Sequence, residues 1–183
     1  MKNVLIAITL FFVLTAQAGD KTKPFNGKIH NIPGLIEAEH WDLGKAGVAY
    51  ADADKQNRGA AYREPTQVDI EKRSDASNGH GIGWTREGEW VVYTVNVKET
   101  GTYRIEIPVA SKKKGGDFHI EMNGKDVTGP ISVPDTGSWQ KLELITHRNV
   151  KLKKGRYLMK VSMDKKGDSG SIADIDYYKF IKE

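Results

Sequence analysis

Apolar residues recur at every second position through most of this chain, and this spacing constrains its fold more than any other feature. Successive side chains of a β-strand point to opposite faces, so apolar residues at alternate positions give one buried face and one solvated face. The pattern is regular in residues 91–97, 103–109, 118–122 and 157–163. Because no long segment has the apolar spacing of a helix, the chain is predicted to consist of antiparallel sheets.

Turn-forming pairs separate these segments at short intervals. The pairs are Thr100-Gly101, Gly115-Gly116, Asn123-Gly124, Thr136-Gly137 and Lys154-Gly155. Many short strands joined by such turns are typical of a β-sandwich or a barrel. We expect an all-β domain, a jelly-roll β-sandwich of antiparallel strands, since this topology limits open sheet edges.

The first 18 residues have the features of a secretory signal peptide. A short basic start precedes an apolar run, Val4–Ala16, and small residues suit cleavage after Ala18. The run is shorter than the roughly 20 residues that a membrane span requires. We therefore expect secretion, to the extracellular space or the periplasm, with residues 19–31 forming a polar tether and residues 32–183 a single folded domain.

The chain has no cysteine and a formal net charge of +4. An exported domain without disulfides must be stabilised by a full-size core or by a bound ion. Lysines cluster in residues 112–114, 151–154 and 165–166. Solvated loop tips are the simpler explanation and an anionic glycan partner is the alternative. Export argues against a nucleic acid partner.

A catalytic constellation is not apparent in the sequence. Ser169 lies in a Gly-Asp-Ser-Gly segment, but only 14 residues follow it and no motif for a partner base precedes it. The histidines lack the spacing of zinc ligands; they are His30, His40, His80, His119 and His147. We expect no enzyme activity and no zinc site.

Glu37 and Glu39 leave more than one interpretation open. They are two residues apart, so on a strand they face the same way, about 7 Å from each other. A solvated strand face and a site for a hard cation with oxygen ligands fit this spacing equally well. A catalytic pair fits less well, because no nearby aromatic or basic residue would separate the two pKa values.

Several segments, in order and spacing, resemble the family 6 carbohydrate-binding modules of secreted glycan-degrading systems. Together the segments cover nearly all of residues 32–181, although no single one is decisive. They are Ile36–Glu39, Gly47–Asp52, Val68–Glu71, Gly83–Val97, Gly101–Tyr103, Asn123–Gly129, Val133–Trp139 and Ala173–Phe180. The resemblance implies a jelly-roll sandwich with a structural calcium ion and a sugar site among loops at one end.

In the family, two aromatic residues clamp a sugar ring, and the matching positions here are Trp84 and Trp139. An asparagine near the C-terminus usually adds a hydrogen bond, and Asp174 takes its place in this chain. The exchange replaces an amide donor with a further acceptor, so the preferred hydroxyl orientation or sugar is expected to differ. Some agar-binding relatives carry a third aromatic residue just before this position. Residues 171–173 contain none, which makes agar a less attractive ligand.

The family's calcium ligands correspond to Glu37, Glu39 and Asp176, completed by backbone carbonyls of the loop around Asn57-Arg58-Gly59. Calcium prefers six to eight oxygen ligands, which such a set supplies. Asp174 and Asp176 have the same strand parity but different expected roles. A bulge or a strand end is therefore predicted between them.

The positions of the tryptophans support the same roles. In the segment after Trp139, Leu142 and Leu144 are predicted to set the buried parity, which places the Trp139 ring in a loop. Trp84 likewise lies at a strand end. Trp90 falls within a regular strand and Trp41 near the first one, so both are expected to pack in the interior.

Together these observations predict a non-catalytic protein that binds a polysaccharide or oligosaccharide. The expected ligand is a plant or algal cell-wall glycan such as a β-glucan or a xylan. We expect a monomer that acts alongside glycoside hydrolases. The alternatives are a small glycosidase or lyase with a carboxylate pair, and a surface adhesion domain that needs no sugar.

Overall fold

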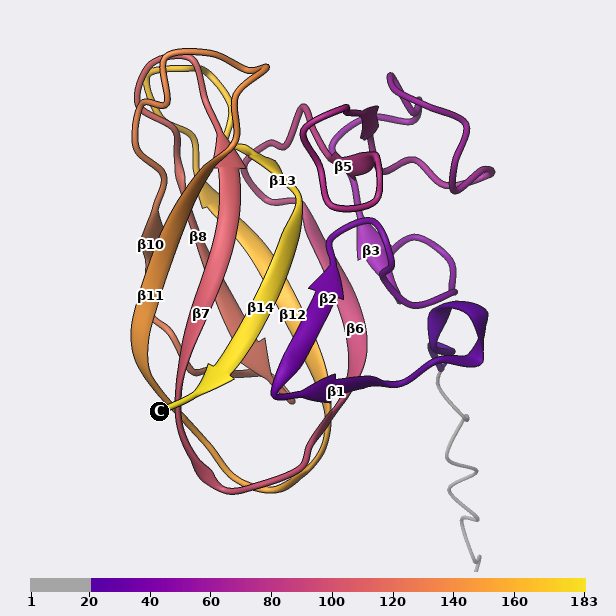
Figure 1. Cartoon of the computed structure of the whole chain (residues 1–183). Helices are drawn as coiled ribbons and strands as arrows, with labels where there is room; N and C mark the ends of the chain where they lie inside the picture. Colours follow the sequence, from indigo (N-terminus) through magenta and orange to yellow (C-terminus); the bar gives the residue numbers. More distant parts are fainter. Residues whose placement is uncertain (1–20) are drawn as a thin grey trace, which may run out of the picture.

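The computed structural model describes residues 21–183, so the predicted signal peptide lies outside the described residues. These residues form two antiparallel β-sheets packed face to face, the predicted jelly-roll β-sandwich (Figure 1). The first sheet contains β1 (His30–Ile32), β3 (Tyr50–Ala51), β6 (Trp90–Val97), β8 (Asp117–Met122), β9 (Lys125–Asp126), β10 (Ile131–Ser132) and β12 (Gly155–Lys165). The second contains β2 (Gly34–Glu37), β4 (Ile70–Lys72), β5 (His80–Ile82), β7 (Gly101–Ala110), β11 (Glu143–Leu152), β13 (Asp174–Ile175) and β14 (Tyr177–Lys182).

Strands distant in sequence are neighbours in both sheets. The first sheet has the order β1-β6-β12-β8-β10, and the second has the order β2-β14-β7-β13-β5-β4 with β11 also on β7. The short β1 is parallel to β6, whereas the other pairs are antiparallel. The long strand β7 runs from one end of the sandwich to the other.

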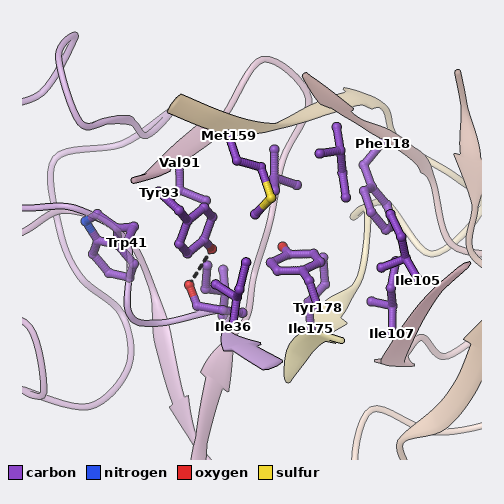
Figure 2. Close-up of a cluster of buried hydrophobic side chains, with 14 of the residues drawn as sticks. Ile36, Trp41, Val91, Tyr93, Ile105, Ile107, Phe118, Met159, Ile175 and Tyr178 are labelled. Atoms are coloured by element: carbon purple, nitrogen blue, oxygen red, sulfur yellow. Dashed lines mark hydrogen bonds between the residues drawn. The ribbon is translucent and has the colours of Figure 1, made fainter. Parts of the chain in front are cut away.

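The alternating residues form the core between the sheets. In β6 and β7 every second side chain is almost fully buried; these residues are Val91, Tyr93, Val95, Val97, Tyr103, Ile105, Ile107 and Val109. Figure 2 shows Tyr93 and Tyr178 from opposite sheets, with ring centroids 5.9 Å apart. The Tyr93 hydroxyl donates a 2.6 Å hydrogen bond to the carbonyl of Ala38, which satisfies the phenol inside the core.

The segment expected to be a tether is packed against the domain over residues 21–31, and that part of the prediction was wrong. Lys23 pairs with Leu43 through two backbone hydrogen bonds. Phe25, in the 3-10 turn Phe25–Gly27, lies 4.1 Å from the guanidinium of Arg63. Arg63 lies equally close to the ring of Trp41, so the cation is held between two aromatic rings. Phe25 therefore anchors a segment whose polar composition predicted a tether.

The tryptophans expected in the interior differ from each other. Trp41 is fully buried, as predicted. Trp90 is only half-buried on the outer face of β6, where the Lys160 ammonium lies 5.7 Å from its ring. The parity expected for the segment after Trp139 was also wrong, since Leu144 is 56% exposed and Ile145 packs on the core instead.

Candidate functional site

One cavity gathers the three predicted binding residues. Its volume is about 360 Å³, and Trp84, Trp139 and Asp174 all contribute to its lining. The other lining residues are Glu71, Arg86, Gln140, Ser169, Gly170 and Ser171. Because Asp174 begins β13 and pairs with the last residue of β7, the cavity lies at the upper end of the sandwich in Figure 1.

Trp84 presents its ring to solvent from a constrained backbone. Its side chain is 42% exposed, and its φ of 49° lies in the left-handed region that non-glycine residues rarely adopt. The next residue, Thr85, is buried and exchanges hydrogen bonds with residues 171–173. These bonds hold the backbone beside Trp84, so the ring remains exposed although burial would be more favourable for an indole.

Trp139 lies in the loop between β10 and β11. The loop is fixed by the buried Thr136, whose hydroxyl accepts a 3.0 Å hydrogen bond from the amide of Ser111. On the other side of Trp139, the amide of Leu142 donates a 3.1 Å hydrogen bond to Asp75. Each anchor joins a backbone amide to a side-chain oxygen, and neither uses the Trp139 side chain, so the Trp139 ring is positioned without being part of the core.

Asp174 is only 5% exposed and belongs to a charge network beneath the cavity. Arg73 donates to Asp174 at 3.0 Å and also pairs with Glu71 and with Asp75. Since Asp75 accepts from the Leu142 amide, the network joins the floor of the cavity to the Trp139 loop. Arg73 and the three carboxyl groups thus hold one another in place at this end of the molecule.

Burial raises the pKa of Asp174 from its ordinary value to about 8, and the neighbouring Glu71 carboxylate adds to the rise. Arg73 opposes this shift only in part. The Asp174 carboxyl therefore keeps its proton to a higher pH than an exposed aspartate does, and a protonated carboxyl both donates and accepts hydrogen bonds. An asparagine side chain at this position has the same capacity.

The three carboxylates predicted to bind a metal lie near one another at a second place, with Ser77 and Asn78 between them. Glu37 ends β2 opposite Tyr177, and the carbonyl of Asp176 accepts a 2.9 Å hydrogen bond from the amide of Ala38. Glu39 is fully buried, and its Oε2 atom has no hydrogen-bond partner. Within residues 21–183 no group of three His, Cys, Asp or Glu side chains is close enough together to hold a metal ion.

Neutral groups lie between these carboxylates. The Ser77 hydroxyl is 2.6 Å from Glu37 Oε2 and 3.0 Å from Asp176 Oδ1, and the Asn78 amide donates to Glu39. Burial raises the pKa of Glu39 to about 7, and repulsion from the other two carboxylates adds to the effect. The three carboxylates therefore repel one another, and one buried oxygen of Glu39 lacks a hydrogen-bond partner.

The contacts of the loop around Asn57-Arg58-Gly59 lead to other carboxylates, and its part in a metal site stays a prediction. Arg58 pairs with Asp54, and its amide donates to Asp69. The segment that reaches the carboxylates is Ser77-Asn78, between β4 and β5. The predicted break between Asp174 and Asp176 is confirmed, because β13 ends at Ile175 and β14 begins at Tyr177.

The sequence analysis missed Arg73, the residue that organises the cavity floor. Its signal was the alternation of charge at Glu71, Arg73 and Asp75, which places acid, base and acid on one side of an extended segment. Opposite charges on one strand face support each other. The pattern is short, and nothing in the sequence indicates that it faces a residue 101 positions later.

A shallow cavity with two accessible indole rings and a small number of polar groups is suited to a sugar ring, whose C–H faces pack on aromatic surfaces. These features define a carbohydrate-binding β-sandwich. The sequence profile described as "Carbohydrate binding module (family 6)" matches residues 58–182. The chain therefore belongs to family 6 of the carbohydrate-binding modules, a family of non-catalytic binding modules.

Known proteins resemble different shares of the chain. The alpha subunit of clotting factor G from Tachypleus tridentatus is 36% identical over 99 residues, which are 53% of this chain and 15% of that protein. A β-1,3-glucan-binding family 6 module from Bacillus halodurans superposes with a TM-score of 0.63 at 25% identity, over 84% of this chain and 98% of that one. The C-terminal family 6 module of LamC, a marine laminarinase from Zobellia galactanivorans, gives 0.59 at 26% identity, over 81% and 98%.

Proposed function

We propose that this protein binds a β-glucan and holds one sugar ring between Trp84 and Trp139. The observation that carries the proposal is that both indoles and Asp174 line the same 360 Å³ cavity. A β-1,3-glucan is the first choice of ligand, because the Bacillus halodurans module that binds it resembles this chain over 84% of its length.

Burial of apolar surface supplies most of the attraction in this mechanism. Enclosing a ring between two indoles removes roughly 100 to 150 Å² of apolar surface from water, which contributes about 3 kcal/mol. Hydrogen bonds add to this term and association entropy opposes it. The result is a dissociation constant of roughly 10 μM to 1 mM per site, which suits reversible attachment to a polymer.

Asp174 gives the hydrogen-bonding specificity. With its proton retained, the carboxyl donates to one sugar oxygen and accepts from another hydroxyl. Arg73 keeps the carboxyl oriented toward the cavity. The family's asparagine and this aspartate then perform the same role near neutral pH.

The chain is proposed to have no catalytic activity, although the cavity contains two carboxyl groups. Glycosidases place their two carboxyl groups about 5 Å apart or more, so that a sugar carbon or a water fits between them. Glu71 and Asp174 both accept from the same nitrogen of Arg73. The two carboxyl groups are therefore held against one guanidinium and do not face each other across a free space for a scissile bond.

A structural calcium ion is proposed for Glu37, Glu39 and Asp176. The unsatisfied Oε2 of Glu39 and the repulsion among the three carboxylates support it. A bound ion would supply charge neutralisation and would fix the junction of β2 with β14. Backbone oxygens of Ser77-Asn78 are the proposed additional ligands.

Export is proposed from residues 1–18 alone, and N-terminal sequencing of the mature protein is expected to begin at Gly19. No helix in the described part of the chain is long and apolar enough to cross a membrane. We further propose that the protein is monomeric and acts alongside glycoside hydrolases. Sedimentation analysis tests the first of these statements.

Isothermal titration calorimetry tests the ligand. The titrants are hexasaccharides of β-1,3-glucan, β-1,4-glucan and β-1,4-xylan, each with release of reducing ends monitored in parallel. We expect the tightest binding for the β-1,3-glucan and no released ends. Lack of binding to all three at millimolar concentration would contradict the sugar site, and released ends would contradict the non-catalytic assignment.

A further inference from the structure

A larger cavity opens at the other end of the sandwich, away from the tryptophans. Its volume is about 540 Å³, and its lining comes from the β6–β7 turn, the β8–β9 hairpin and the β11–β12 turn. Gly101, which begins β7, lines this cavity, whereas Ala110, which ends β7, pairs with Asp174. Nine residue steps of strand separate the two cavities, or roughly 30 Å. They have no lining residue in common.

Three lysines surround this second cavity. Lys125, Lys151 and Lys153 are exposed and come from two segments, Lys125 from the β8–β9 hairpin and the other two from the end of β11 and the turn after it. No ion pair engages any of them within residues 21–183. The lining contains no aspartate or glutamate. The fold therefore concentrates positive charge that its own residues do not neutralise.

Glu183, whose amide bonds to the lining residue Thr102, pairs with Arg148, and Glu99 and Asp126 also have other partners. Glu99 pairs with Lys182. The Asp126 carboxylate accepts backbone hydrogen bonds from Thr128 and Gly129 at 3.0 and 2.8 Å. None of these three side chains lines the cavity. Clustered lysines without internal partners favour an external anion.

The floor between the lysines is apolar. Val127 and Tyr157 pack against the hydrophobic core with one side, and Leu152 is buried beside them. The Tyr157 hydroxyl donates a 3.0 Å hydrogen bond to the carbonyl of Lys153, which fixes the ring along the turn. A side-chain carbon at Gly155 would lie 3.3 Å from this ring, so glycine leaves the space that the ring uses. The aromatic surface is thus held in a defined position.

We propose that this cavity is a second binding site, for an acidic oligosaccharide that carries carboxylate or sulfate groups. The lysines would pair with the anionic groups, and the ring of Tyr157 with its aliphatic neighbours would receive the C–H face of the sugar. Isolated phosphate would use only the lysines. The combination of lysines around the cavity and an apolar floor therefore favours a charged sugar over a simple anion.

Calorimetry with the full mature chain tests the site. The probes are a sulfated galactan hexasaccharide, its chemically desulfated counterpart and a hexagalacturonate, each at 50 and 300 mM NaCl. We expect both acidic probes to bind, the desulfated probe to bind at least tenfold more weakly at this site, and higher salt to weaken the acidic probes. Amide chemical-shift changes are expected at residues 100–102, 125–127 and 151–157.

Two sets of variants locate the binding. The triple change Lys125→Gln, Lys151→Gln and Lys153→Gln is expected to reduce affinity for the acidic probes at least tenfold. The matched control changes Lys112, Lys113 and Lys114 to Gln, which alters the net charge equally. Tyr157→Phe retains the ring and is expected to bind, whereas Tyr157→Leu is expected to lose most of the affinity.

The outcomes separate this site from the tryptophan cavity. Trp84→Ala is expected to leave the acidic probes bound, and the lysine triple variant is expected to leave β-glucan bound. Equal loss in the two lysine variants would overturn the proposal, as would binding of a single-stranded oligonucleotide or inorganic phosphate as tightly as the acidic sugars. Shift changes confined to residues near Trp84 and Trp139 would also overturn it.

Discussion

Arg73, the residue that follows β4, donates a 3.0 Å hydrogen bond to Asp174 at the start of β13, across 101 positions of sequence. The same guanidinium holds Glu71 and Asp75. This one residue therefore couples the orientation of the proposed sugar-binding carboxyl to the loop that carries Trp139. Because one network positions both the Asp174 carboxyl and the Trp139 loop, the cavity is sensitive to the protonation of Asp174.

Asp174→Asn is expected to preserve glycan binding and remove its dependence on pH. The pKa of Asp174 is raised to about 8, so in the native protein the donor proton is present at pH 7 and lost as the pH rises through 8. Affinity should fall about fivefold between pH 7 and pH 9, the effect of one hydrogen bond of about 1 kcal/mol. Calorimetry at several pH values measures this. Identical pH profiles for the two proteins would contradict the role of the proton.

Trp84→Ala and Trp139→Ala are each expected to abolish detectable glycan binding. Both rings lie on fixed loops outside the core, so the free energy of unfolding should change by less than about 0.5 kcal/mol. Trp41→Ala is the control, and removing this buried ring should cost about 3 to 5 kcal/mol. Urea titration and calorimetry give the two readouts. A loss of stability at Trp84 as large as that at Trp41 would show that its ring supports the fold.

Chelation of calcium is expected to lower the melting temperature by about 5 to 10 °C. An ion that binds only the native state at a hundred times its dissociation constant contributes about 2.7 kcal/mol, and each kcal/mol shifts the midpoint by about 2 to 4 °C for a chain of this size. Asp176→Asn should remove most of this response. Scanning calorimetry with calcium and with chelator tests the native protein and the variant. Equal midpoints in the native protein would contradict a metal site at Glu37 and Glu39.

Phe25→Ala is expected to destabilise the domain by about 2 kcal/mol, because it removes one of the two rings that enclose the Arg63 cation. Phe25→Leu retains the apolar contact without the aromatic face and should cost less. Urea titrations of the three proteins give the comparison. Unchanged stability in the alanine variant would indicate that residues 21–31 behave as the tether that their composition predicts.

The strands could be predicted from the sequence, and the resemblance to family 6 modules selected Trp84, Trp139 and Asp174, which line one cavity. The alternation of apolar and polar residues is a property of each strand by itself. In β6 and β7 it determines which side chains enter the core, whichever strand packs on the other side. It failed in β11, where Leu144 is exposed and Ile145 is inward, because leucine at an open strand face costs little.

Contacts between distant segments could not be predicted in the same way. Ser77 meets Asp176, and Phe25 meets Arg63, only because the sheets bring their segments together. Hydroxyl and aromatic residues in polar loops have no periodicity to indicate a partner.

The last strand, β14, descends from Asp176 to the lysine-lined end, where the amide of Glu183 donates a 2.9 Å hydrogen bond to the carbonyl of Thr102 (Figure 1). A protein coupled to a solid surface through its C-terminus would stand on that end, with Trp84 and Trp139 facing the solution. Such a surface would capture β-glucan freely while crowding the cavity around Tyr157. Orientation on a sensor chip would then be enough to tell the two binding activities apart without any substitution.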